Sequence, residues 1–107
     1  MEDKLVIVLT TVNGKDEGAA LARGIVERRL AACVQILPPM TSVYRWDEKI
    51  QEETEHLLLI KTLSSRWDDL RLFIVENHSY SVPEIVVLDA AAVSVEYADW
   101  LRAELAG

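Results

Sequence analysis

Residues 30–62 constrain the fold of this chain more than any other stretch, because they describe one long hairpin. The outer parts of the stretch are rich in β-branched and aromatic side chains, whereas Asp47 and Glu48 form a polar turn in the middle. Each arm of about 14 residues would extend about 45 Å, while an ordinary strand extends about 17 to 20 Å. We therefore expect the arms to reach beyond their own sheet and to need another copy of the chain to cover them.

The first arm is interrupted by Pro38 and Pro39, which have no backbone N–H to donate to a sheet. Prolines in sheets are confined to edges and bulges. This arm is therefore predicted to bend at the two prolines and to lie at an edge of the sheet.

Size and charge limit what the chain can be. Its 107 residues are the size of one domain, so we expect residues 1–107 to form a single folding unit. The 18 acidic and 11 basic side chains give a formal charge of -7, which repels phosphate backbones and anionic lipids. No apolar run reaches the roughly 18 residues of a membrane span, and no signal peptide is evident. With a single cysteine, Cys33, the composition predicts a cytoplasmic protein that binds neither nucleic acid nor membrane.

Hydrophobic patterns predict four strands and three helices. The predicted elements are a strand over 5–12, a helix ending near 29, the two hairpin arms, a helix capped at Ser65 and ending at Asn77, a strand over 84–89 and a final helix after Ser94. The order of strand, helix, strand, strand, helix, strand is the split βαβ pattern of ferredoxin-like sheets, an α+β fold with a strand order of 4-1-3-2. Both crossover helices must then cover the same face.

The second face of that sheet is predicted to lack a cover. Residues 6–9, 57–60 and 85–88 are apolar at consecutive positions and therefore place apolar side chains on both faces. About six such side chains would remain exposed, and burying each contributes about 1.5 to 3 kcal/mol, so the total is on the order of 10 kcal/mol. The final helix could cover some of them, but association with other copies is the more economical prediction.

Five blocks of sequence, in order across nearly the whole chain, resemble the CutA divalent-cation tolerance family. The blocks are RLAACV (29–34), SVYRW (42–46), LLIKT (58–62), HSYSVPEI (78–85) and YADW (97–100). The resemblance implies a ferredoxin-like subunit in a tight homotrimer, with long hairpins that cross subunit boundaries and an architecture similar to that of PII signalling trimers. It also implies a link to tolerance of copper and other divalent metals.

The chain departs from the family pattern in three places. Glu48 stands where the hairpin turn commonly has glycine, Ser79 replaces a proline between His78 and Tyr80, and Pro39 replaces a frequent glycine. A glutamate does not easily adopt a positive φ, so we expect a longer or differently typed turn.

Cys33 and His78 are the candidate metal ligands. A cysteine thiolate is a good ligand for copper(I) or zinc, although a free cysteine is commonly just a small buried side chain. His78 lies in a polar loop near Tyr80 and Glu84, where it could bind metal or simply hydrogen-bond the loop. We expect Cys33 and His78 at the same end of the sheet, about 14 Å apart, which is too far for one ion. A shared metal site would therefore need residues from adjacent chains.

Lys61 interrupts an apolar strand, and the predicted pairing places it opposite Cys33. We expect it at the end of the sheet where the Tyr80 loop also arrives. Its charge could hold an anionic ligand, the Glu84 carboxylate or a neighbour's chain end. Of these roles, we favour a structural ion pair.

Tyr44 and Trp46 lie on one face of the first arm, near its tip and beyond reach of the subunit's own core. Aromatic side chains at such a position suit docking onto a neighbouring copy. Stacking on a bound ligand is the alternative.

The residues indicate a binding protein rather than an enzyme. One cysteine and two histidines offer no nucleophile paired with a base and an orienting group, and no glycine-rich phosphate loop occurs. We predict a trimeric divalent-cation tolerance protein that binds copper or another divalent metal near subunit boundaries. The alternatives are a PII-like trimer that binds a small anionic metabolite between subunits through Lys61, the Tyr80 loop and the aromatic arm, and a passive structural or interaction trimer.

Overall fold

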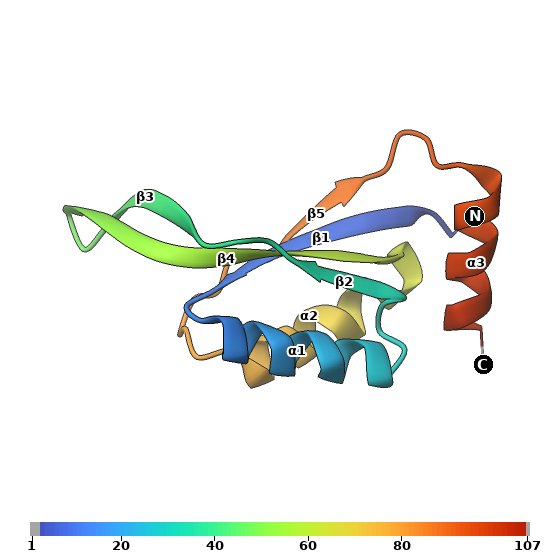
Figure 1. Cartoon of the computed structure of the whole chain (residues 1–107), viewed down its shortest axis with the longest axis horizontal. Helices are drawn as coiled ribbons and strands as arrows, with labels where there is room; N and C mark the ends of the chain where they lie inside the picture. Colours follow the sequence, from blue (N-terminus) through green and yellow to red (C-terminus); the bar gives the residue numbers. More distant parts are fainter. Residues whose placement is uncertain (1–2, 107) are drawn as a thin grey trace.

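The chain folds around an antiparallel sheet with β1 and β4 at its centre, and the computed structural model describes residues 3–106 (Figure 1). The strands are β1 (Leu5–Val12), β2 (Cys33–Ile36), β3 (Met40–Trp46), β4 (Lys49–Leu63) and β5 (Val86–Asp89). The helices are α1 (Lys15–Glu27), α2 (Trp67–Asn77) and α3 (Val95–Leu105), with a 3-10 turn at Ser64–Arg66. The sheet order β2-β4-β1-β5 confirms the predicted split βαβ arrangement and its α+β class.

Helices α1 and α2 cover the same face of the sheet (Figure 1). The core between these two helices and the sheet contains Val6, Val8, Val12, Leu21, Ile25, Leu58, Ile60, Leu70 and Ile74. The two helices approach closely at Gly24, where a Cβ would lie 2.9 Å from Cζ of Phe73. Glycine at this position therefore sets the distance between α1 and α2. Among residues 3–106, no helix is long and apolar enough to cross a membrane.

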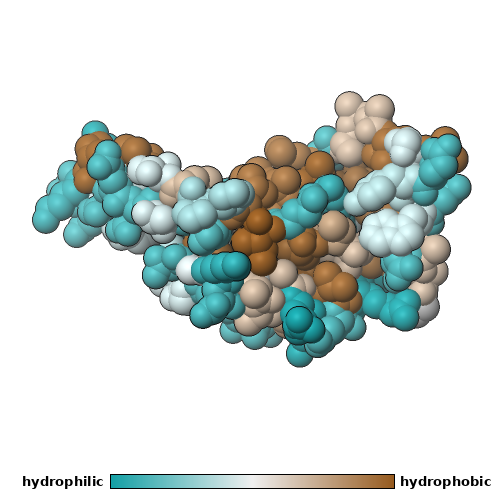
Figure 2. All heavy atoms as spheres, viewed as in Figure 1, coloured by the Kyte–Doolittle hydropathy of each residue, from teal (hydrophilic) through white to brown (hydrophobic). Residues whose placement is uncertain are grey.

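The opposite face of the sheet carries six partly exposed apolar side chains, as predicted. We call these residues the bare face: Ile7, Leu9, Leu57, Leu59, Val86 and Leu88. They are paired across three neighbouring strands, at positions that alternate with the buried residues facing α1 and α2. Figure 2 shows hydrophobic residues gathered over the middle of the molecule, whereas most of the projecting hairpin is hydrophilic.

Helix α3 covers only one end of this second face. Leu101 and Leu105 pack there against Leu5 and Leu63 in a separate small core. The predicted cap is present, because Ser94 Oγ accepts a hydrogen bond from the backbone N–H of the first turn. The cover that α3 supplies is therefore partial, and the bare face remains.

Two arginines hold the C-terminal end of α3. Arg29 Nη1 donates to the carbonyl oxygens of Glu104 and Ala106, each over 3.1 Å, and Arg66 donates to the carbonyl of Leu105. Positive charge suits the carbonyl end of a helix. Arg29 has a φ of 55°, at the left-handed position that ends α1, where glycine is usual. Its side chain thus ties the end of α1 to the end of α3.

The hairpin projects beyond the sheet, and its outer part consists of β3 paired with the first half of β4 (Figure 1). The turn contains Asp47 and Glu48, at φ of 51° and 63°, between the paired residues Trp46 and Lys49. The expectation of a longer or differently typed turn is therefore wrong. Two positive φ values match the right-handed twist of a hairpin, and the continuous ladder behind the turn stabilises the left-handed conformation of Glu48.

The first arm bends at its prolines, as predicted. Cys33 pairs with Lys61, and Met40 pairs with Glu55, so the arm advances from 33 to 40 while β4 retreats only from 61 to 55. One residue is thus unpaired between β2 and β3, where the prolines lie. Strand β5 begins at Val86, later than the predicted position 84, because its ladder with β1 starts at the Val86 and Leu9 pair.

Candidate functional site

Cys33 and Lys61 lie directly opposite each other, on β2 and β4, as the hairpin pairing predicted. Both are half-buried, and both lie on the same side of the sheet as the bare face. Strand β2 is one of the two edge strands of the sheet, so the thiol stands at an open side of the subunit. This corner of the sheet is the first group of candidate residues that the structure brings together.

Tyr97 of α3 completes this corner. The Lys61 Nζ lies 5.6 Å from the centre of the Tyr97 ring, and the ring itself packs at 5.5 Å against Trp100. Burial raises the pKa of Tyr97, and the charge and hydrogen bond of Cys33 raise it further. The sequence predicted the final helix, which carries Tyr97, but could not place that helix over Cys33. The signal that existed was the YADW block alone.

His78 lies at the opposite end of the sheet from Cys33, so the expectation of a common end is wrong. Strand β2 runs parallel to β1 and β5 runs antiparallel to it, so β2 begins beside the point where β5 ends. His78 precedes β5 and contacts the far end of β1 instead, where its Nε2 donates to the carbonyl of Thr11 over 2.7 Å. Cys33 and His78 of one chain therefore cannot share an ion.

Both ring nitrogens of His78 are engaged in hydrogen bonds. Besides the bond from Nε2, Nδ1 accepts from the backbone N–H of Tyr80 over 3.0 Å, and the two rings pack at 4.8 Å. This pattern fits the neutral ring with its proton on Nε2. A metal ion at either nitrogen would have to displace one of these bonds. His78 thus positions the loop that follows α2.

Tyr80 from that loop reaches the base of the hairpin. Its hydroxyl donates to Glu55 Oε2 over 2.8 Å, and Glu55 is only 7% exposed. Burial of the hydroxyl raises the pKa of Tyr80 far above its ordinary range, together with the hydrogen bond to Glu55. Next to it, Glu17 of α1 accepts a hydrogen bond from the backbone N–H of Ser79. Sequence reasoning missed Glu55, because a burial created by a distant loop leaves no local pattern.

The expected grouping of Lys61 with Tyr80 and Glu84 is also wrong. Tyr80 contacts Glu55, which precedes Lys61 by six positions on β4, a separation of about 20 Å along the strand. Glu84 is exposed in the loop before β5, near the same far end as Tyr80. The composite anion site drawn from the sequence is therefore not assembled within one chain.

Tyr44 and Trp46 lie near the tip of β3 on the same side of the arm, as predicted, and are 40% and 53% exposed. They stand opposite Gln51 and Lys49 on β4, outside the reach of the core beneath α1 and α2. Large aromatic side chains left this exposed on a projecting arm are suited to contact with another molecule.

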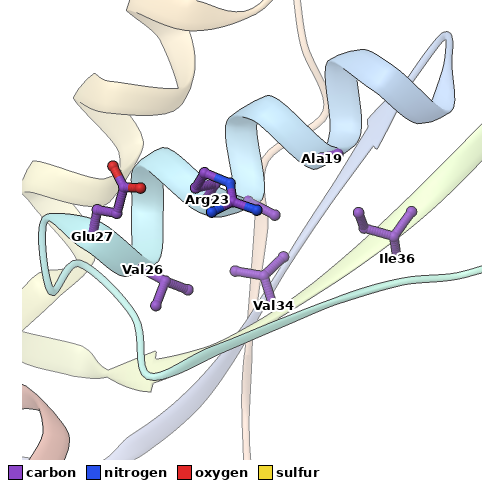
Figure 3. Close-up of a pocket in the computed structure, with 7 residues that line it drawn as sticks. Ala19, Arg23, Val26, Glu27, Val34 and Ile36 are labelled. Atoms are coloured by element: carbon purple, nitrogen blue, oxygen red, sulfur yellow. The ribbon is translucent and has the colours of Figure 1, made fainter.

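A groove of about 410 Å³ runs between α1 and the edge strand β2 (Figure 3). It is lined by Ala19, Ala22, Arg23, Val26, Glu27, Val34 and Ile36. Figure 3 shows Val34 and Ile36 rising from β2 toward α1, with Arg23 and Glu27 on the helix. The groove contains none of the predicted site residues, and its apolar wall offers no ligand to a metal ion.

One chain does not assemble a metal site within residues 3–106. No group of three His, Cys, Asp or Glu side chains there is arranged to hold an ion. The soft thiolate of Cys33 and the imidazole of His78 are suitable donors in type, but the topology separates them. Within residues 3–106, the His, Cys, Asp and Glu side chains of a single copy therefore do not form a three-ligand site for a resident metal ion.

The fold and these sites define a small split βαβ protein with a projecting hairpin, a largely uncovered sheet face and two separate clusters of polar side chains. A family model described as CutA1 divalent ion tolerance protein matches residues 6–104. The chain belongs to this family.

Relatives and solved structures agree with the assignment. The divalent-cation tolerance protein CutA of Thermus thermophilus is 45% identical over 96 residues, which cover 90% of this chain and 93% of that protein. The chloroplastic protein CutA of Arabidopsis thaliana is 41% identical, and the match covers 91% of this chain but 53% of the relative. The structure of CutA from Synechococcus elongatus PCC7942 superposes with a TM-score of 0.93 at 42% identity, covering 98% of this chain and 93% of that chain.

Proposed function

We propose that this chain acts in divalent-cation tolerance as a homotrimer that binds copper between its copies. The observation that carries the proposal is the bare face, six apolar side chains on three neighbouring strands that α3 leaves uncovered. Each of these six side chains is half exposed or less, so covering them contributes several kcal/mol per chain to the free energy of association, at about 25 cal/mol per Å² of apolar surface. Self-association supplies that cover without requiring a further protein.

The shape of the sheet supports a closed ring of copies. Helices α1 and α2 cover one face of the sheet, the bare face is the other, and β2 and β5 are the two edge strands. An edge strand can pair with an edge strand of another copy. If β2 of one copy meets β5 of the next, the contact is head-to-tail and repeats until the ring closes. Tyr44 and Trp46 on the projecting arm then serve as anchors on a neighbouring copy.

Cys33 is the proposed copper ligand with the stronger support. It lies on edge strand β2, where a second copy would arrive, and a thiolate is the preferred kind of ligand for copper(I). His78 is the second proposed ligand, and metal binding there requires loss of its bond to Thr11 or to Tyr80. Binding between copies is consistent with the absence of a three-residue cluster in the described part of one chain. The cytoplasmic location remains a prediction from composition.

Copper titration of the purified protein tests the metal proposal. Copper(I), with a competing chelator, and copper(II) are titrated into the wild type, Cys33→Ser, His78→Ala and the control His56→Ala. We expect Cys33→Ser to weaken copper(I) binding at least tenfold, and the control to match the wild type. Equal affinity in all four proteins would exclude both proposed ligands. No binding of either ion at micromolar concentration would refute the metal proposal itself.

A further inference from the structure

The turn between β1 and α1 consists of two residues, Asn13 and Gly14. The Asn13 side chain is exposed. Gly14 has an extended backbone, and a Cβ added to it would meet no atom within 4 Å. Among residues 3–106, the backbone N–H of Gly14 has no hydrogen-bond acceptor. The backbone nitrogen of Gly14 is therefore open to reaction with the side chain that precedes it.

An asparagine followed by glycine can lose ammonia without an enzyme. The Gly14 nitrogen attacks Cγ of Asn13 and closes a five-membered imide, while the side-chain nitrogen leaves as ammonia with the proton of the backbone amide. Water then opens the imide at either carbonyl and gives aspartate or isoaspartate. Glycine favours the first step, because it has no side chain to hinder the closure and its backbone is the most adaptable. Both products add a negative charge, and isoaspartate also adds one carbon atom to the main chain.

Asn77 is the other asparagine of the chain, and its surroundings differ. Its Nδ2 donates to the carbonyl of Phe73 over 2.8 Å, which ties the side chain to α2. The residue that follows is the half-buried His78 instead of glycine, and both of its ring nitrogens are hydrogen-bonded. Asn77 is therefore the less reactive of the two asparagines.

The turn after β1 is connected to the loop after α2. Figure 1 shows this turn beside the loop that precedes β5, and Glu17 of α1 accepts a hydrogen bond from the backbone N–H of Ser79 over 2.9 Å. Burial raises the pKa of Glu17, but hydrogen bonds from Ser79 and from the backbone N–H of Asn13 outweigh it, so the pKa is lowered. The Glu17 carboxylate thus joins the turn to the loop that carries His78 and Tyr80.

We infer that Asn13 is a site of spontaneous deamidation and that its isoaspartate product loosens the loop at Ser79. Strand β1 is held by its ladder with β4 as far as Val12, and α1 is held by its buried side chains. The added main-chain carbon lies between these two elements and displaces the first turn of α1, which carries Glu17. The new carboxylate also repels the Glu17 carboxylate. This inference does not depend on the proposed self-association.

Ageing of the full-length protein at mildly alkaline pH tests the site, because base removes the proton of the attacking amide. Trypsin releases residues 5–15, which contain Asn13, and residues 72–102, which contain Asn77. Mass spectrometry measures the conversion of amide to acid in each peptide, and chromatography separates isoaspartate from aspartate. We expect conversion of the first peptide and not of the second. Equal conversion of the two asparagines would overturn the inference.

Gly14→Ala is the matched variant, since the extended backbone and the open space around Gly14 accept an alanine. It should slow the conversion of Asn13 at least tenfold, because the added methyl group hinders ring closure. An unchanged rate in this variant would refute the proposed attack by the Gly14 nitrogen.

Hydrogen exchange of the backbone amides in residues 78–81 tests the effect on the loop. Exchange should be faster in the aged wild type than in the fresh protein, and equal in aged and fresh Gly14→Ala. Asn13→Asp adds the charge without the main-chain carbon and should change the exchange less. A converted wild type with unchanged exchange would overturn the link between Asn13 and the loop.

Discussion

Removal of the Tyr80 hydroxyl tests how the loop after α2 holds the base of the hairpin. Tyr80→Phe keeps the ring that packs at 4.8 Å against His78 but removes the 2.8 Å hydrogen bond to Glu55. Because Glu55 is 7% exposed, water replaces the lost donor poorly. Hydrogen bonds to charged groups contribute about 1.5 to 3 kcal/mol. The free energy of unfolding should therefore fall by about 2 kcal/mol.

Urea unfolding at a fixed protein concentration measures this change, because dissociation of an oligomer would make the midpoint depend on concentration. The slope of the free energy of unfolding against urea concentration should be the same in both proteins, which would show that the unfolded state is unchanged. Arg71→Lys, at an exposed position of α2, is the control, and its change should stay within about 0.5 kcal/mol.

A double-mutant cycle with Glu55→Gln isolates the contact between the two side chains. The coupling energy should be about 1 to 2 kcal/mol, since the residues are directly bonded. Additive losses in the cycle, or a Tyr80→Phe protein as stable as the wild type, would show that this bond does not hold the hairpin base.

Five further substitutions, at four residues, probe other contacts of the fold by chemical denaturation. Arg29→Ala and Arg29→Gly both lose two hydrogen bonds to the end of α3, but glycine relieves the φ of 55°, so alanine should be the worse by about 1 kcal/mol. Thr62→Val should lower the free energy of unfolding by about 1 to 2 kcal/mol, because the fully buried Thr62 hydroxyl donates to the carbonyl of Leu30 over 2.7 Å. Thr10→Val should be neutral or stabilising, because the buried Thr10 hydroxyl has no partner among the described residues. The hydrogen bond from the Ser65 side chain is the main cause that lowers the pKa of Asp3. Asp3 therefore stabilises the fold above its unfolded pKa of about 3.9, and this contribution is lost as the pH falls below that value. Asp3→Asn should make the free energy of unfolding depend less on pH in this acidic range. Equal losses for the two Arg29 variants, equal effects of the two threonine changes, or an unchanged acid limb would each contradict the corresponding contact.

The sequence was sufficient to predict the order of elements and the sheet, because both follow from local periodicity and from chirality. Strand β1 has the predicted bounds and helix α2 ends at the predicted Asn77, although the predicted cap at Ser65 is absent because Ser64–Arg66 form a 3-10 turn. Cys33 faces Lys61 because the hairpin turn determines the pairing of everything behind it. The bare face was predictable for the same reason. Apolar residues at consecutive positions must point to both sides of a strand.

The errors in the predicted sites arose from strand direction and from contacts between distant segments. Cys33 and His78 were placed at one end of the sheet, although β2 and β5 run in opposite directions. That mistake also moved Tyr80 next to Lys61. The bond between Tyr80 and Glu55 joins a loop to a hairpin, and no spacing within either segment indicates it. At the hairpin turn, the preference of Glu48 for negative φ was outweighed by the twist of the two long strands.

The central claim is that the bare face is buried between copies of this chain, and sedimentation equilibrium tests it directly. The wild type should sediment with about three times its chain mass of 12.1 kDa at micromolar concentration. Leu59→Glu places a charge in the bare face and should shift the protein to the monomer, with far-ultraviolet circular dichroism showing that the fold is retained. Leu72→Glu, on a 47% exposed side chain of α2, should remain trimeric. A monomeric wild type, or a Leu59→Glu protein that keeps the trimer mass, would contradict the account.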